Sequence, residues 1–130
     1  MSDDAAPAVS GAPLTLLRLE GAALLAAAAV LYAQTAAPWW LFAVLVLAPD
    51  LSLLGYLAGP RSGAIAYNAV HTTLGPIILW LLGQFWLSPD ATAVALIWLA
   101  HIGADRMLGY GLKYGAGFGY THLGRIGRAT

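Results

Sequence analysis

The chain has 130 residues, of which 60% are hydrophobic and 9% are charged, and its formal net charge is zero. A typical soluble domain is roughly 25% charged, so this composition excludes a soluble globular domain and indicates an integral membrane protein. The zero net charge gives no bulk attraction to nucleic acid. The absence of cysteine excludes disulfides, cysteine-ligated zinc and iron–sulfur clusters.

The N-terminal residues 1–13 are acidic and rich in alanine and proline, which is typical of a disordered tail. They lack the basic n-region of a secretory signal. Behind them, apolar runs are separated by clusters of glycine, proline and small polar residues. These breaks predict four transmembrane helices of the ~20 residues that a bilayer core requires, over residues 14–34, 39–58, 64–86 and 91–110. We expect residues 14–112 to form the transmembrane domain, with a kink at Pro76.

The basic residues indicate how these helices cross the membrane. With four spans, both termini and the loop at 59–63 share one side. All six cations fall at or near that side: Arg18, Arg61, Arg106, Lys113, Arg125 and Arg128. Interfacial aromatics mark the opposite ends of the spans: Tyr32, Trp39, Trp40 and Trp86. Because basic loops stay in the cytoplasm, we predict an all-α, four-span helical bundle in the cytoplasmic (inner) membrane, with both termini inside (N-in/C-in).

Five ionisable residues lie within the predicted spans, although a carboxylate at the centre of a bilayer costs about 2.5–3.5 kcal/mol on the insertion scale. They are Glu20, Asp50, His71, His101 and Asp105. Counted from the cytoplasmic end of each helix at ~1.5 Å per residue, all five lie roughly 8–14 Å below the boundary. His101 and Asp105 are four residues apart and share one helix face. We therefore expect the five side chains to face the interior of the bundle at one level.

Histidine and carboxylate side chains are the ligands of zinc and of carboxylate-bridged iron sites in helical bundles. The candidate ligands of a divalent metal, zinc or iron, are Asp50, His71, His101 and Asp105. Glu20 is a candidate further ligand or general base. A metal with an open position activates water, which predicts a hydrolase acting on a lipid-like substrate that enters from the cytoplasmic leaflet. A di-iron pair would make oxidation possible instead.

The same residues admit three other interpretations. A purely structural polar network would make the protein a non-enzymatic accessory subunit, with Glu20 paired to Arg18 or Arg106, Asp105 paired to Arg106, and both histidines neutral. The two histidines could also ligate a haem, although the nearby acids argue against it. A proton or ion path is disfavoured, because the outer half of each span has no comparable polar residues.

The C-terminal residues 113–130 form a basic tail, and seven glycines fall between positions 109 and 127. Interleaved aromatic and basic residues indicate an anchor on the cytoplasmic membrane surface. Alternatively, the glycines permit the tight backbone path of a lid, which would bring His122 to the site as a ligand or proton-transfer group. Small residues on one face of the first span, from Gly21 to Ala29, would suit a homodimer or a larger membrane complex.

Three segments carry the most distinctive residue patterns: LRLEG (17–21), PDLSLLGYLAGPRSGAIAYNAVHT (49–72) and LIWLAHIGADRMLGYGLKYGAGFGYTHLGRIG (96–127). Together they resemble the small bacterial membrane proteins of domain-of-unknown-function family 4260, over nearly all of the chain after residue 13. That resemblance implies a four-helix membrane protein and no established activity. Pro49-Asp50 and His101-x3-Asp105 are also similar to elements of membrane-bound metal-dependent hydrolases, which implies metal-dependent hydrolysis.

Overall fold

The computed structural model describes residues 7–115 and 118–125 of the chain. Within these residues lie five α-helices, one 3-10 helix and two short strands. In chain order they are α1 (Gly11–Ala33), α2 (Trp39–Leu45), η2 (Ala48–Ala58), α3 (Pro60–His71), α4 (Leu74–Phe85), α5 (Pro89–Leu108), β1 (Tyr120–Thr121) and β2 (Gly124–Arg125).

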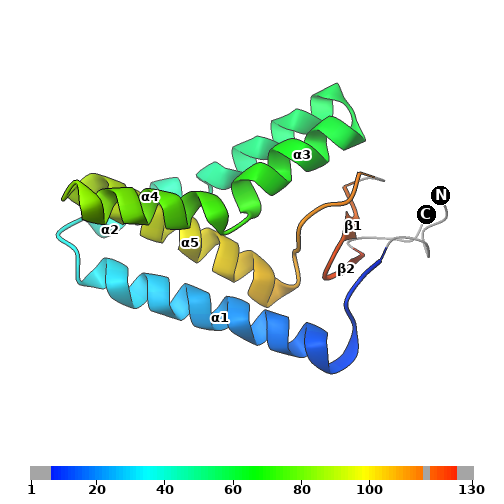
Figure 1. Ribbon diagram of the computed structural model, residues 1–130, viewed down its shortest axis with the longest axis horizontal. Helices are drawn as coiled ribbons and strands as arrows, with labels where there is room; N and C mark the ends of the chain where they lie inside the picture. Colours follow the sequence, from blue (N-terminus) through cyan, green and yellow to red (C-terminus); the bar gives the residue numbers. More distant parts are fainter. Residues whose placement is uncertain (1–6, 116–117, 126–130) are drawn as a thin grey trace.

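The last long helix, α5, is the centre of the molecule (Figure 1). It packs against α1 and against α4, while α3 pairs with η2 in an arm that leans away from α1. A larger share of α5 is buried than of any other segment long enough to span a membrane. Its side chains are therefore the ones placed to form a shared interior.

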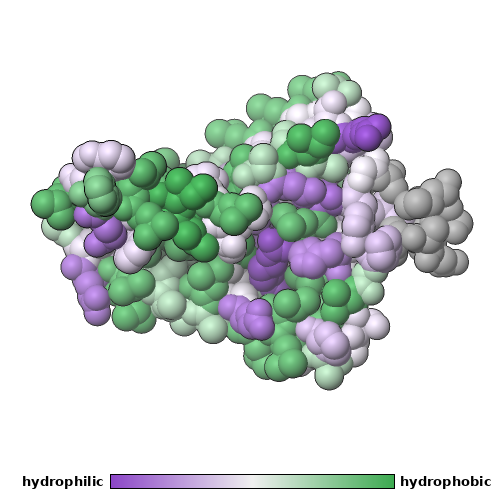
Figure 2. All heavy atoms as spheres, viewed as in Figure 1, coloured by the Kyte–Doolittle hydropathy of each residue, from purple (hydrophilic) through white to green (hydrophobic). Residues whose placement is uncertain are grey.

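Four segments are long and apolar enough to cross a membrane, namely Gly11–Ala33, Trp39–Ala58, Pro60–Phe85 and Pro89–Leu108. They confirm the four predicted spans, with small shifts at the ends. Apolar residues cover most of the visible surface of α4 (Figure 2). On η2, Leu51, Leu54 and Leu57 are 68%, 64% and 88% exposed. Such a surface suits the hydrocarbon of a bilayer, because proteins in water rarely expose an apolar patch of this extent.

The second span changes helix type at Pro49. Proline has no N–H to donate to the carbonyl four residues earlier. Just beyond it, the Asp50 N–H donates to the Leu47 carbonyl, three residues back, at 3.1 Å. In a continuous α-helix that N–H would bond to the Val46 carbonyl. The 3-10 turn therefore leaves the Val46 carbonyl free for another donor.

The third span is divided into α3 and α4 by a break at Thr72 and Thr73. A kink at Pro76 was expected, and the break lies four residues earlier, at Thr72. Pro76 has no N–H to donate to the Thr72 carbonyl, so the helical hydrogen bond is missing there. Thr72 is extended, with ψ of 149°. The α-helical bonds resume with the Ile77 N–H, which donates to the Thr73 carbonyl at 3.1 Å. As a result α3 ends at His71 and diverges from α4 (Figure 1).

One end of the bundle, called here the apolar end, is closed by a hydrophobic cluster. Its buried members are Tyr32, Ala93, Leu96 and Ile97, with Phe42 and Trp80 packed against them. The place of Tyr32 near a span end predicts an interfacial side chain, but the structure buries it fully. Its hydroxyl donates to the Pro38 carbonyl at 2.7 Å. Because a buried hydroxyl with a partner avoids most of the desolvation cost, this polar atom is satisfied within the chain.

Glycines allow α1 and α5 to approach closely. A Cβ on Gly21 would lie 2.4 Å from the Arg106 Cβ, and one on Gly103 would lie 2.6 Å from the Leu25 backbone nitrogen. Side chains larger than hydrogen would therefore push the two helices apart. The predicted dimer face of α1 thus includes residues that pack inside the chain, since Gly21 and Ala28 are both buried.

The segment after α5 folds back against the helices. β1 and β2 form an antiparallel hairpin, and Lys113 bridges to Thr121. The Asn68 side chain on α3 accepts a hydrogen bond from the Lys113 N–H at 2.6 Å and donates one to the Lys113 carbonyl at 2.7 Å. The Val9 N–H donates to the His122 carbonyl at 2.8 Å. These bonds hold the segment beside α3 and the start of α1.

Two predicted segments extend beyond the described residues. Of the N-terminal tail predicted over 1–13, residues 1–6 lie outside them, and α1 already begins at Gly11. Of the C-terminal tail predicted over 113–130, residues 116–117 and 126–130 lie outside them. The side of the membrane on which the termini lie stays a prediction from the basic residues.

Candidate metal centre

Four of the six candidate site residues converge where η2, α3 and α5 meet. Asp50 lies in the first turn of η2, His71 ends α3, and His101 and Asp105 lie one turn apart on α5. One ligand atom of each lies within 4.8 Å of those of the other three. The structure therefore brings these four residues to the common level predicted from the sequence. Because each offers an atom that could hold a metal ion, they are called here the ligand cluster.

The ligand cluster is compact. The Nε2 atoms of His71 and His101 are 3.2 Å apart. The Asp50 Oδ1 atom lies 3.4 Å from the first of these nitrogens and 3.2 Å from the second. The Asp105 Oδ2 atom lies 3.6 Å and 3.3 Å from the same two. All five distances are close to the edge of about 3.3 Å in a tetrahedron with metal–ligand bonds near 2.0 Å, which is the geometry of zinc sites.

Backbone carbonyls fix which nitrogen of each histidine carries the proton. The His71 Nδ1 donates to the Tyr67 carbonyl at 2.9 Å, and the His101 Nδ1 donates to the Val46 carbonyl that the turn at Pro49 leaves free. In a neutral imidazole the other nitrogen, Nε2, is then an acceptor. Two Nε2 lone pairs and two carboxylate oxygens therefore face one another with no donor among the four atoms. Such an arrangement is repulsive unless a cation lies between the four atoms or one imidazole takes up a proton and becomes a donor.

The ligand cluster fits one metal ion. Five of the six distances between the ligand atoms match one tetrahedral site, whereas a di-metal site holds ions ~3.5–4 Å apart and needs further bridging ligands. Imidazole together with carboxylate suits zinc or iron. Metal-ligating histidines nearly always donate their second N–H to a carbonyl or carboxylate, as both histidines do here.

A cavity of about 300 Å³ opens on the carboxylate side of the ligand cluster. Its lining consists of Asp50, Leu53, Tyr67, Asp105, Tyr110, Lys113 and Phe118. The side chains of the two histidines are 3% and 5% exposed, whereas that of Asp50 is 43% exposed. The carboxylate side is thus the side of the ligand cluster that opens to the cavity. In Figure 2, polar residues gather between the α3 arm and α1.

Neighbouring side chains hold the ligands in place. The Tyr67 ring stacks on His71 with ring centroids 3.7 Å apart, and its hydroxyl donates to the Asp105 Oδ2 at 3.4 Å. The Arg106 Nη2 donates to the His71 carbonyl at 3.0 Å. Arg106 therefore satisfies the C-terminal end of α3 beside a ligand, and it forms no ion pair with Asp105 among the described residues.

Glu20 lies outside the ligand cluster. It is exposed on α1, whereas its neighbour Gly21 faces α5. Successive residues of an α-helix point about 100° apart, so a shared depth does not bring Glu20 inward. Within the described chain Glu20 pairs with neither Arg18 nor Arg106, and the Arg18 Nε donates to the Met107 carbonyl at 2.9 Å instead. The structure therefore places Glu20 in contact with none of the four ligands.

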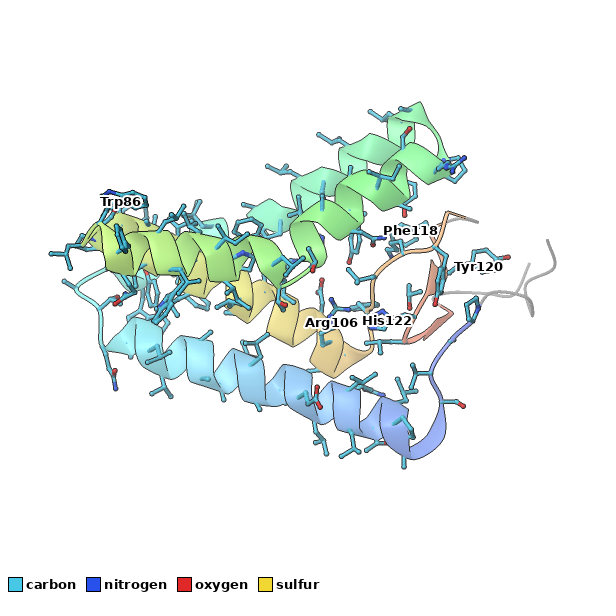
Figure 3. The ribbon with its side chains drawn as sticks, in the orientation of Figure 1. Trp86, Arg106, Phe118, Tyr120 and His122 are labelled. Atoms are coloured by element: carbon cyan, nitrogen blue, oxygen red, sulfur yellow. The ribbon has the colours of Figure 1, made fainter. Side chains whose placement is uncertain are left out.

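His122 lies beside the ligand cluster, next to Arg106 (Figure 3). Its Nδ1 accepts a hydrogen bond from the Leu112 N–H at 2.9 Å, and its Nε2 is 3.4 Å from the Arg106 Nη1. Burial and the Arg106 charge lower the pKa of His122, which favours the neutral ring. A neutral ring that accepts at Nδ1 carries its proton on Nε2. Both facing atoms, the His122 Nε2 and the Arg106 Nη1, then carry protons, so His122 packs against Arg106 without a hydrogen bond to it, while Arg106 itself donates to the His71 carbonyl.

The structure adds one charged residue that the sequence did not single out for the site. Lys113 is 4% exposed. Its Nζ lies 3.7 Å from the centroid of the Phe118 ring and 4.7 Å from that of Tyr67. Burial lowers the pKa of the Lys113 ammonium to about 8, against the opposing effect of the Asp105 and Asp50 carboxylates. Lys113 lies beyond the last helix, so no periodicity marks it, and the surrounding glycines and aromatics are the only signal in the sequence.

Comparison with curated proteins and with solved structures gave no match. A family model does match: the one described as domain of unknown function DUF4260 covers residues 14–126. The matched range contains all four residues of the ligand cluster, and it confirms the resemblance carried by the three distinctive segments. The chain therefore belongs to the DUF4260 family.

Proposed function

We propose that this protein is a membrane-embedded, metal-dependent hydrolase in which Asp50, His71, His101 and Asp105 bind one divalent metal, zinc or iron. The observation that carries the proposal is the meeting of four acceptor atoms with no donor among them. Two carboxylates, 43% and 20% exposed, that face neutral imidazoles without a compensating charge would lower the stability of the fold. A divalent cation offsets both carboxylates and uses both Nε2 lone pairs.

The cavity supports a catalytic rather than a purely structural site. Structural zinc sites are closed on all sides, whereas catalytic sites keep a position open to water. Two imidazoles and two carboxylates would fill all four positions of a tetrahedral ion. A position for water therefore requires Asp50, the more exposed carboxylate, to leave the ion, or coordination to expand to five. Both carboxylates line the cavity from which that water would come. A divalent cation bound there would lower the pKa of a coordinated water toward neutrality and polarise an ester.

Asp50 is the residue placed to move protons, because it is the more exposed of the two carboxylates. It accepts a proton from the attacking water, whose oxygen forms a bond to the electrophilic carbon or phosphorus of an ester. The bond to the leaving oxygen breaks, and that oxygen takes the electron pair and then the proton from Asp50. Asp105 is less exposed and accepts a hydrogen bond from Tyr67, which suits a fixed ligand.

The surroundings of the cavity favour a lipid-like substrate. Leu53 of η2 lines the cavity, and the leucines Leu51, Leu54 and Leu57 cover the outward face of the same helix. An acyl chain lying against this face would keep its reactive group level with the ligand cluster. The basic residues predict that this level is near the cytoplasmic leaflet of the inner membrane.

The two alternatives are less well supported by the geometry. A bis-histidine haem needs a porphyrin between the two rings, where the Asp50 and Asp105 oxygens lie 3.2–3.6 Å from the same nitrogens. A packing network in an accessory subunit needs donors, and the ligand cluster would supply them only by taking up protons. The accessory subunit therefore predicts a protein without bound metal.

Elemental analysis of the detergent-purified protein tests the proposal. We expect about one zinc or iron per chain, a lower thermal midpoint after chelation, and recovery when the metal is restored. His71→Ala and His101→Ala should each retain less than about a tenth of a metal per chain. Gln84→Ala is a matched control, because Gln84 lies on α4 and bonds to Thr92 instead of a cluster residue, and it should keep its metal.

A wild-type chain without metal, whose stability is unaffected by chelator, would rule out the metal site and favour the accessory subunit. Hydrolysis is measured separately on the metal-loaded protein, with ester lipids supplied in mixed micelles. Stoichiometric metal without hydrolysis of any acyl ester or phosphoester would instead indicate a structural metal.

A further inference from the structure

Lys113 is a buried cation without an anionic partner. Its side chain is 4% exposed, and no carboxylate lies within ion-pairing distance of its Nζ in the part of the chain that the structure describes. The Lys113 Nζ instead lies over the faces of the Phe118 and Tyr67 rings. Aromatic faces attract an ammonium but recover only part of its hydration energy. The ammonium therefore has unused capacity to bind an anion.

The position of Lys113 is fixed by the fold. Its N–H and carbonyl are both bonded to the Asn68 side chain, at 2.6 Å and 2.7 Å, and its backbone bridges to Thr121. The neighbouring Phe118 ring packs edge-on against Tyr56 with centroids 5.7 Å apart. A charged group that is held before its ligand arrives loses little entropy on binding.

The cavity between Lys113 and the ligand cluster carries unequal charge. With the proposed divalent cation bound, its two positive charges offset the Asp50 and Asp105 carboxylates, and Lys113 leaves one positive charge on the cavity wall. A phosphodiester carries one negative charge, whereas a phosphate monoester carries about −1.5 to −2 at neutral pH. The charge of the cavity therefore matches the diester.

We infer that the cavity binds the phosphodiester group of a membrane phospholipid, with one non-bridging oxygen on the Lys113 ammonium and the other toward the ligand cluster. The inference rests on the proposed function, because the two carboxylates would repel a phosphate if no metal were bound. The reaction is then hydrolysis of a P–O ester bond. The water oxygen bonds to phosphorus, one ester oxygen leaves with its electron pair and a proton, and the products are a phosphate monoester and an alcohol.

Other lipids fit the cavity less well. A fatty-acid carboxylate carries one negative charge but has no bond for the site to hydrolyse. A neutral acyl ester would leave the Lys113 ammonium buried beside apolar atoms with no anion, which is costly. Leu53, Tyr110 and Phe118 supply the apolar part of the lining, as the glycerol and acyl portions of a phospholipid require.

Binding of a short-chain phospholipid tests the inference on the full-length, metal-loaded protein in neutral, phosphate-free detergent. Dihexanoyl phosphatidylglycerol is titrated, and tryptophan fluorescence reports the bound fraction. We expect Lys113→Met to raise the Kd by about tenfold or more, because a charge-assisted bond to phosphate is lost, and Lys113→Arg to keep most of the affinity. Arg61→Met removes an exposed cation at the start of α3 and should bind as the wild type does.

Metal content and thermal midpoint are measured on every variant, so that misfolding and metal loss are recognised. Equal Kd values for the wild type and Lys113→Met, with metal retained in both, would overturn the inference and leave the proposed function standing. Dihexanoylglycerol binding as tightly as the phospholipid would also overturn it, as would inorganic phosphate binding equally well. A wild-type chain that holds no metal would overturn the proposed function and this inference together.

Discussion

The apolar end and the ligand cluster are built on the same helix but are stabilised in different ways. Leu96 and Ile97 of α5 pack into the apolar end, and His101 and Asp105 of α5 lie in the ligand cluster. At the apolar end the buried Tyr32 hydroxyl has a carbonyl partner at 2.7 Å. In the ligand cluster four acceptor atoms meet with no donor among them, although the Tyr67 hydroxyl donates to one of the four, the Asp105 Oδ2. The polar group of the first region is satisfied within the protein, whereas the second presents a set of acceptors that could hold a metal ion.

The comparison separates stability from site formation. At the apolar end, side-chain packing acts without any ligand, and in a bilayer it relies on van der Waals contact more than on exclusion of water. In the ligand cluster, the same backbone contacts bring groups together that repel one another until they are neutralised. A substitution in one region should therefore change different observables from a matched substitution in the other.

The largest effect on folding stability is expected from filling the close contact beside the ligand cluster. A Cβ in Gly103→Ala would lie 2.6 Å and 2.8 Å from backbone atoms of α1. Overpacking of this kind costs about 1–3 kcal/mol. Because Gly103 lies between His101 and Asp105, the displaced helix should also bind metal more weakly. Thermal unfolding and metal analysis of the same preparation measure both effects.

Gly83→Ala is the matched substitution. Gly83 lies on α4, where that helix packs against Thr92 of α5. Its Cβ would lie 2.6 Å from the Thr92 Oγ1 and 2.9 Å from the Thr92 nitrogen, so a similar loss of stability is expected. Its metal content should stay at the wild-type value. If Gly83→Ala and Gly103→Ala lose metal in equal measure, the two regions are not independent.

The next effect separates the two carboxylates. Asp105→Asn should weaken metal binding by at least about 100-fold, since even residues that only orient a ligand contribute 10–100-fold. Asp50→Asn should keep most of its metal in excess zinc, while hydrolysis falls by roughly 10²–10⁴-fold through loss of the proton acceptor. Metal titration followed by a hydrolysis assay on loaded protein distinguishes them. Equal metal loss in both variants would show that the ion holds Asp50 as firmly as Asp105.

The level of the polar residues was predictable from the sequence, but their direction was not. Rise per residue gives a depth for each side chain, and it placed Asp50, His71, His101 and Asp105 together, as the structure confirms. Depth contains no information about which face of a helix a residue occupies. Glu20 has the right depth and points away, because Gly21 is the residue that allows α1 to approach α5.

The backbone details of the site were also beyond the sequence pattern. Pro49 and Pro76 both signal an interruption, but only the structure shows that one releases the Val46 carbonyl for His101 and the other ends α3 at His71. Lys113 is held in place by its bonds to Asn68. The two residues are 45 positions apart in the chain, so no periodic pattern connects them. Local patterns predict elements, whereas contacts between distant segments decide which side chains meet.

The smallest effects are expected from removing a tyrosine hydroxyl in each region. Tyr32→Phe leaves the Pro38 carbonyl without its donor and should cost about 0.5–1.5 kcal/mol of stability, with unchanged metal affinity. Tyr67→Phe keeps the ring that stacks on His71 and removes only a 3.4 Å bond to Asp105. Its stability should change little, while its metal affinity falls by up to about tenfold, because Asp105 is less firmly oriented.

Thermal unfolding and a competitive metal titration on both variants form a crossed test, in which each variant is the control for the other. If Tyr67→Phe binds metal as tightly as the wild type, the hydroxyl does not orient Asp105, and the stacked ring alone accounts for the role of Tyr67. If Tyr32→Phe also lowers metal affinity, strain at the apolar end is transmitted along α5 to His101. The ligand cluster would then depend on the packing of the whole helix rather than on its own neighbours.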